Sequence, residues 1–260
     1  MFKRTDQSGS DFSRMISIII PAKNEETDLP VLLKSITQQT LQPKEVILAD
    51  ADSQDRTVAI AQSLGAQIVR GGLPSVGRNA GAAAATADLL LFLDADVELR
   101  DPEFLEKSLG EMLERKLDIA TCDVFPLSDK YRDHVLHQAY NTYVRAWGSV
   151  FPHAPGFCMF VRKDLHDRIG GFDEEISFCE DHDYARRANK HGQFGFLHST
   201  KIPVSIRRLD RDGRLSVAIK YILAELHLAA LGPIKHNLFN YQFGHKKQHS
   251  QEEYAKSDKM

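Results

Sequence analysis

The chain contains little cysteine and no excess of positive charge. Its three cysteines are widely separated and form no Cys-x-x-Cys pair, which argues against a disulfide framework and against structural zinc. The formal net charge of −3 provides no electrostatic basis for binding nucleic acid. We therefore expect a cytoplasmic protein without a nucleic-acid partner.

Long apolar runs and glycine-rich phosphate loops are also missing. No run of about 18 apolar residues occurs, so no transmembrane helix is expected, and the polar N-terminal stretch lacks the apolar core of a signal peptide. The absence of Gly-x-Gly-x-x-Gly and of Gly-Lys-Ser/Thr argues against a dinucleotide-dependent enzyme and a P-loop NTPase. A length of 260 residues and 42% hydrophobic residues suit a soluble globular protein.

The most informative stretch is the apolar run Leu89–Leu93 followed by Asp94, Ala95 and Asp96. The run has the length of a strand and does not alternate with polar residues, which predicts a strand buried on both faces. Open α/β sheets bind ligands at such strand ends. Because two close carboxylates repel each other, we interpret the pair as a site for a divalent cation that carries phosphate oxygens. Two acids that cap a turn and face water are the alternative.

Strand and helix patterns alternate over roughly the first hundred residues, with expected strands at 15–21, 45–50, 66–70 and 89–93. Short connections between them predict an α/β fold with a doubly wound, mostly parallel sheet flanked by helices. Further along the chain, the expected helices are 102–116, 129–147, 177–189 and 216–231, and the expected strands are 118–125, 194–197 and 202–206.

We expect the chain to have four parts. They are a flexible N-terminus (1–14), one domain (15–215) with a nucleotide-binding half (15–100) and an acceptor half (101–215), an apolar helical segment (216–243) and a disordered tail (244–260). The stretch 216–231 is too short to span a bilayer but long enough to lie on one, at the inner face of the membrane. Packing on the domain or forming a contact in an oligomer is the alternative.

Polar loops follow the first two expected strands and contain Asn24, Glu25, Glu26, Asp50, Asp52 and Asp55. In a doubly wound sheet these loops open onto the same edge as the Asp94 loop. Carboxylates there can bind ribose hydroxyls or base N–H groups, whereas helix capping explains one of them but not all. Arg78, which lies near two glycines at an expected helix start, is the leading cation for phosphates.

Six blocks occur in a fixed order: Ile18–Glu26, Asp50–Thr57, Gly77–Gly81, Asp94–Asp96, Gly170–Asp173 and Glu180–Asp183. Taken together over about residues 15–208, they resemble the family 2 glycosyltransferases. This resemblance implies the nucleotide-diphospho-sugar transferase fold called GT-A and a Mg²⁺ or Mn²⁺ ion. It also implies that a sugar passes, with inversion, from a nucleotide-sugar donor to a hydroxyl acceptor, either a glycan or a lipid-linked molecule.

The resemblance also implies roles for individual residues. The base and ribose would be contacted by Pro21, Ala22, Asn24, Glu25 and Asp52. Arg78 would lie near the diphosphate, the ribose or sugar would meet Asp94 and Ala95, and the metal would be held by Asp96 and Asp94. The pair Glu180 and Asp181 would contain the catalytic base, with Asp181 preferred. Neighbouring helical residues point roughly 100° apart, so only one of the pair can face the acceptor.

The chain departs from the family pattern in two places. Where family members often have a histidine, this sequence reads Val204–Arg208, and we expect Arg207 to neutralise the diphosphate instead. The Gln-x-x-Arg-Trp block of processive synthases is absent. Two other functions stay open: a haloacid dehalogenase-type phosphatase with Asp94 as nucleophile, and a nucleotide-sugar-binding protein without turnover.

Overall fold

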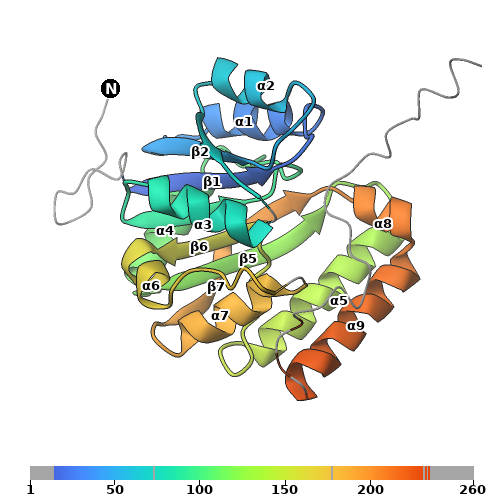
Figure 1. Ribbon diagram of the computed structural model, residues 1–260. Helices are drawn as coiled ribbons and strands as arrows, with labels where there is room; N and C mark the ends of the chain where they lie inside the picture. Colours follow the sequence, from blue (N-terminus) through green and yellow to red (C-terminus); the bar gives the residue numbers. More distant parts are fainter. Residues whose placement is uncertain (1–14, 73, 177, 231, 233, 235–260) are drawn as a thin grey trace, which may run out of the picture.

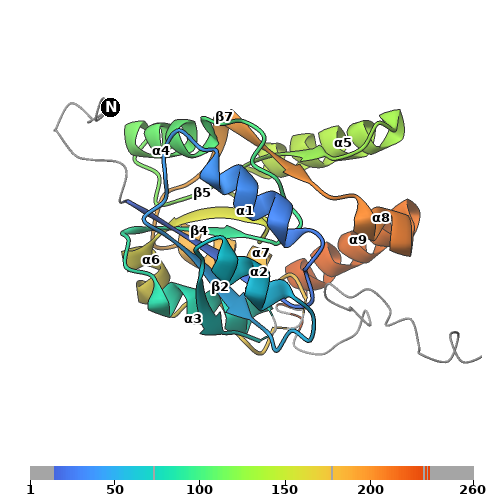
Figure 2. The same ribbon diagram turned by 90° about the horizontal axis from the view of Figure 1, so that it is seen from above.

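The structure is a computed structural model that describes residues 15–72, 74–176, 178–230, 232 and 234. The expectations for 1–14 and 244–260 therefore lie outside the described residues. A seven-stranded sheet in the order β3-β2-β1-β4-β6-β5-β7 crosses the centre of the molecule, with helices on both of its faces (Figures 1 and 2).

The strands are mostly parallel, as expected. Only β6 runs antiparallel to its neighbours β4 and β5 among the pairings of this sheet in the described chain. The strands are β1 (Ile16–Ala22), β2 (Glu45–Asp50), β3 (Gln67–Arg70), β4 (Leu89–Leu93), β5 (Ile119–Pro126), β6 (Cys158–Arg162) and β7 (Phe194–Val204).

The helices are α1 (Leu29–Thr37), α2 (Thr57–Ser63), α3 (Pro74–Ala84), α4 (Phe104–Glu114), α5 (Tyr131–Trp147), α6 (Lys163–Arg168), α7 (Glu180–Asn189), α8 (Arg207–Asp212) and α9 (Arg214–Ala230). Helices α1 to α7 lie between strands along the chain, and α8 and α9 follow the last strand, β7. Within the described ranges, no helix has both the length and the apolar character needed to cross a membrane.

The central strand β4 is buried on both faces, which confirms the expectation for its apolar run. Leu89, Leu91 and Leu93 pack into one apolar cluster with residues of α1 and α4. Leu90 and Phe92 point the other way, into a second cluster with residues of α3 and α7. Because successive side chains of a strand alternate between faces, one apolar run supplies both cores and ends at the Asp94 loop.

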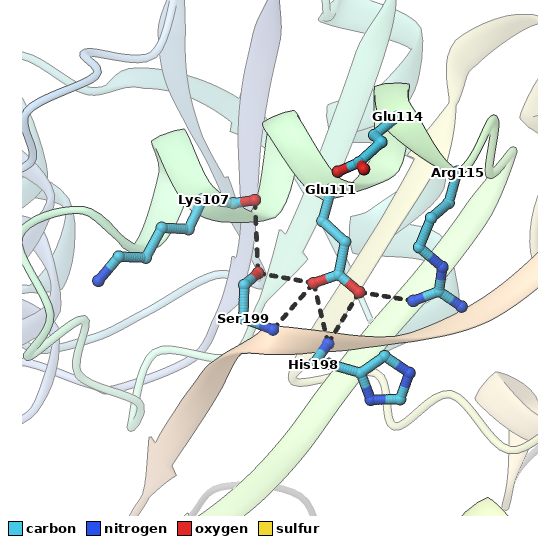
Figure 3. A pocket seen from close by; sticks show the side chains of 6 residues that line it. All are labelled: Lys107, Glu111, Glu114, Arg115, His198 and Ser199. Carbon is cyan, nitrogen blue, oxygen red and sulfur yellow. Dashed lines mark hydrogen bonds and ion pairs between the residues drawn. The ribbon is translucent and has the colours of Figure 1, made fainter.

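The expectation of two strands at 194–197 and 202–206 is wrong, because β7 is one strand with an irregularity. Its register against β5 shifts: Leu197 pairs with Cys122, and Lys201 pairs with Asp123. Figure 3 shows how the intervening residues are held by the carboxylate of Glu111 on α4. That carboxylate accepts hydrogen bonds from the backbone N–H groups of His198 and Ser199, each at 2.9 Å. The polar residues 198–200, which in the sequence predict the end of a strand, therefore stay within β7.

Candidate functional site

The loops that follow β1 and β2 form one hydrogen-bonded unit at the carboxyl edge of the sheet. The backbone N–H of Asn24 donates to Ser53 Oγ at 2.9 Å, and Gln54 N–H donates to Asn24 Oδ1 at 2.8 Å. The N–H of Glu25 donates to Thr57 Oγ1 at 2.8 Å. The loops therefore hold each other beside Pro21 and Ala22, the last residues of β1.

A first charged cluster gathers around Arg207, at the start of α8. Its guanidinium forms ion pairs with Glu25 at 3.3 Å, with Asp96 at 3.4 Å, and with Asp28. Arg207 therefore joins the loops after β1 and β4 to the later part of the chain. Burial raises the pKa of Glu25 to about 7, although Arg207 opposes this rise. Burial and the neighbouring Asp94 raise the pKa of Asp96 to about 6.

A second charged cluster is centred on Arg78 of α3, which is 3% exposed. Its Nη1 donates to Glu180 Oε1 at 2.7 Å, and its Nη2 donates to Asp94 Oδ1 at 3.0 Å. Burial acts against the charge of Arg78, but Asp94, Glu180 and Asp181 hold its pKa above the ordinary value. One guanidinium thus ties the end of β4 to the start of α7.

Glycine at position 156 makes room for this guanidinium. A Cβ atom built there would lie 2.4 Å from Arg78 Nη2, closer than real Cβ contacts come. The backbone N–H of Gly156 also donates to Asp181 Oδ2 at 2.8 Å. The same residue therefore contacts both the bridging arginine and the carboxylate that the sequence favours as base.

The two acids at the start of α7 lie in different surroundings. The side chain of Glu180 is 10% exposed and is bonded to Arg78, and burial together with Asp181 raises its pKa. The side chain of Asp181 is 20% exposed, and its Oδ1 accepts a hydrogen bond from the N–H of His182 at 2.9 Å. Asp181 is therefore the more accessible of the pair.

Asp52 and Asp50 show where the sequence and the structure point to different residues. Asp52 is exposed, has a left-handed backbone (φ +61°) and belongs to neither charged cluster. Asp50, at the end of β2, has a buried Oδ1 without a hydrogen-bond partner among the described residues. A buried acceptor of this kind suits an N–H or O–H group of a ligand. The sequence placed Asp50 in an acidic loop but could not single it out, because burial of one oxygen has no local pattern.

Asp94 and Asp96 are the two carboxylates that the sequence proposes for a divalent cation, and each forms an ion pair, Asp94 with Arg78 and Asp96 with Arg207. Ala95 between them is buried, whereas the two carboxylate side chains are 38% and 30% exposed. No cluster of three or more His, Cys, Asp or Glu that could bind a metal occurs in the part of the chain that the structure describes. The site would therefore supply two oxygen ligands, which fits Mg²⁺ because this ion often takes its remaining ligands from phosphates and water.

Comparison with known proteins identifies the family. The sequence model described as "Glycosyl transferase family 2" matches residues 17–170, more than half of the chain. The chain belongs to this family. It is 43% identical over 103 residues to the 4,4'-diaponeurosporenoate glycosyltransferase of Staphylococcus haemolyticus, covering 36% of this chain and 27% of that protein. The first curated relatives are matched over 27% to 60% of their own length.

Solved structures show the fold. The mannosyltransferase PcManGT from Pyrobaculum calidifontis, in complex with GDP-Man and Mn²⁺, matches with a TM-score of 0.63 at 17% identity, over 81% of this chain and 61% of that one. Staphylococcus aureus TarS 1-349, in complex with UDP-GlcNAc, matches with a TM-score of 0.59 at 18% identity, over 74% and 59%. These likenesses confirm the GT-A fold expected from the sequence.

Proposed function

We propose that the protein is a glycosyltransferase that moves a sugar from a nucleotide-sugar donor to a hydroxyl acceptor, with inversion at the anomeric carbon. The observation that carries this proposal is the bridge through Arg78 between Asp94 and Glu180. It brings the acidic loop expected to bind the donor next to the acidic pair expected to serve the acceptor. Family membership supports the reaction type, and the ligands of the structural neighbours support the donor class.

Asp181 acts as the general base. An inverting transfer is one in-line displacement, so a single carboxylate suffices to take the proton of the acceptor hydroxyl. The N–H groups of Gly156 and His182 donate to the two oxygens of Asp181, which holds the orientation of its carboxylate. Glu180 is bonded to Arg78 and positions the first turn of α7.

The donor lies along the carboxyl edge of β1, β2 and β4, within the nucleotide-binding half 15–100. The base and ribose contact the two interlocked loops through Pro21, Ala22, Asn24, Glu25 and Asp52, and the buried acceptor of Asp50 adds a bond. Arg207 neutralises the diphosphate, and Asp94 and Ala95 lie against the ribose or sugar. Mg²⁺ or Mn²⁺ held by Asp96 and Asp94 would, when bound, neutralise charge on the leaving diphosphate.

The acceptor half, 101–215, supplies α7 and α8 and thus both Asp181 and Arg207. The acceptor is a hydroxyl of a glycan or of a lipid-linked molecule. The peripheral membrane contact expected from the apolar C-terminal segment concerns another element, α9, which contains 216–230.

Release of nucleoside diphosphate from nucleotide sugars, with water as the acceptor, tests the reaction. The full chain is incubated with UDP-, GDP-, CDP- and dTDP-sugars and Mn²⁺. We expect release from one nucleotide class, reduced about 10² to 10⁴-fold in Asp181→Asn, because the base is lost while the donor site remains. Asp164→Asn, which changes an exposed acid on α6, serves as the matched control.

Three outcomes would contradict the proposal. Undiminished release by Asp181→Asn would remove this residue from the mechanism. If both wild type and Asp181→Asn bound the donor but released no nucleoside diphosphate, the protein would be a nucleotide-sugar-binding protein without turnover. Hydrolysis of p-nitrophenyl phosphate that Asp94→Asn abolishes would instead indicate a phosphatase.

A further inference from the structure

Helix α5 presents an apolar face to solvent. Its exposed apolar side chains, between 41% and 82% exposed, are Tyr131, Val135, Leu136, Tyr143 and Trp147. At about 100° per residue these five positions fall within an arc of roughly 160°. The opposite side of the helix packs on the domain through Asp133, Asn141 and Val144. A surface helix ordinarily turns its polar side to water, so this arrangement is inverted.

Helix α9 adds an exposed apolar stripe on the same side of the molecule. Leu215, Ile219 and Leu223 recur every fourth residue and are 74%, 46% and 49% exposed. Arg214 at the start of α9 donates to Asp133 of α5 at 3.0 Å, which joins the first turns of the two helices. Figures 1 and 2 both place α5 and α9 on the right-hand side of the view.

The exposed face of α5 has a basic side chain and no acidic one. The only acidic residue of α5, Asp133, is buried and paired with Arg214. Arg132 is exposed, and Arg145 is exposed but forms an ion pair with Asp123 at 2.7 Å. Segments 130–150 and 207–230 together contain eight Lys and Arg against four Asp and Glu. Six of these eight basic side chains form ion pairs with acids inside or outside the two segments, and Arg132 and Lys220 are the other two. The exposed face of α5 therefore combines aromatic, aliphatic and basic side chains without an acid.

We propose that the apolar face of α5, extended by the α9 stripe, docks on the surface of a bilayer that contains anionic lipid. Tyrosine and tryptophan favour the membrane–water interface, and aliphatic side chains gain free energy by entering its apolar boundary. Basic residues near the surface attract anionic headgroups. Two copies that met through this face would bring Arg132 of each together with no acid on either α5, whereas anionic headgroups supply the opposite charge.

Docking does not depend on the proposed transfer reaction, because α5 and α9 contribute none of the residues placed in the site. It does have a consequence for that reaction. The short helix α8 connects β7 to α9 and contains Arg207, so a bilayer beside α9 adjoins the acceptor half. A lipid-linked acceptor would then reach the site from the membrane surface.

Flotation of the full chain with phosphatidylcholine vesicles, with and without phosphatidylglycerol, tests the proposal. We expect the wild-type protein to float with the anionic vesicles and to bind less at high salt, because headgroup attraction is screened. Leu136→Glu should lower the partition coefficient about tenfold, because it puts a charge into the apolar boundary. Leu113→Glu on α4 is the matched control: the same residue type, equally 41% exposed, should tolerate the change.

Trp147→Ser provides a second variant on the same face, and circular dichroism checks that each variant is folded. The proposal would be overturned if the wild-type protein stayed at the bottom of the gradient with anionic vesicles. It would also be overturned if Leu113→Glu lost as much vesicle binding as Leu136→Glu. A dimer in solution that Leu136→Glu dissociates, without vesicle binding, would show that a second copy covers the face. Nucleoside diphosphate release should be the same in Leu136→Glu, so the failure of docking and the failure of the transfer reaction are distinguishable.

Discussion

The side chain of Arg78 is 4% exposed, yet its guanidinium contacts carboxylates that lie 16 and 102 residues away along the chain. An unpaired buried charge costs several kcal/mol, so the two carboxylates compensate the cost of burying the charge of Arg78. Arg78 thus acts as a positioning residue, since it sets the distance between the end of β4 and the start of α7. The sequence interpretation placed it beside the diphosphate, whereas we propose from its burial that it acts on the donor through Asp94.

Gly156→Ala tests this bridge at the scale of one methyl group. The added Cβ would displace Arg78 from Asp94 or Glu180, and we expect turnover to fall about tenfold with about 1 to 3 kcal/mol lost in stability. The nucleotide KM should change less, because the loops after β1 and β2 are untouched. Gly110→Ala is the control, since nothing lies within 4 Å of its added Cβ. Full turnover in Gly156→Ala would show that the bridge is dispensable.

Residue identity alone could not rank the acids at the end of β2. Asp50 and Asp52 both look like ligand-binding carboxylates at a strand end. Only the structure shows that one oxygen of Asp50 is buried without a described partner, whereas Asp52 is exposed. The sequence could predict the loop but not which of its acids the fold would desolvate.

At the scale of the element, β7 depends on a carboxylate from another helix. Glu111 lies about 87 residues before His198, and its oxygens accept bonds from His198, Ser199 and Arg115. Burial acts to raise the pKa of Glu111, but the bonds from Ser199 and His198 lower it to about 2. Because this contact is remote in sequence, the local pattern around 198–200 predicted a break instead of a bulge.

Stability should therefore depend on pH through Glu111. Its folded pKa is below the unfolded value of 4.5, so its contribution is present above about pH 4.5 and is lost as pH falls toward about 2. We expect Glu111→Gln to lower the free energy of unfolding by about 2 to 3 kcal/mol at pH 7. Chemical denaturation at several pH values should show that the difference in free energy of unfolding between Glu111→Gln and wild type becomes smaller at acidic pH. Glu114→Gln, an exposed acid on the same helix, is the control, and a difference that does not change with pH would contradict this account.

At the scale of the whole molecule, the apolar runs predicted most of the sheet. The expected strand 45–50 coincides with β2, and 15–21 differs from β1 by one residue at each end. These runs are buried on both faces, so hydrophobicity alone indicates them. The polar helix α8 was not predicted, because its six residues are mostly charged and contain no repeat of apolar residues at helical spacing. The loops of the site were predicted from topology, whereas the pairing of Arg78 with Glu180 was not, since it depends on tertiary packing.

The central claim, that the acidic edge of the sheet binds a nucleotide with a divalent cation, is tested most directly by thermal unfolding. The full chain is heated with UDP, GDP, CDP or dTDP, each with Mn²⁺ or with EDTA. Binding to the folded state alone raises the melting temperature, by about 5 to 10 °C for a ligand at a hundred times its Kd. We predict such a rise with one nucleotide, in Mn²⁺ and not in EDTA. An unchanged melting temperature with all four nucleotides would contradict the account.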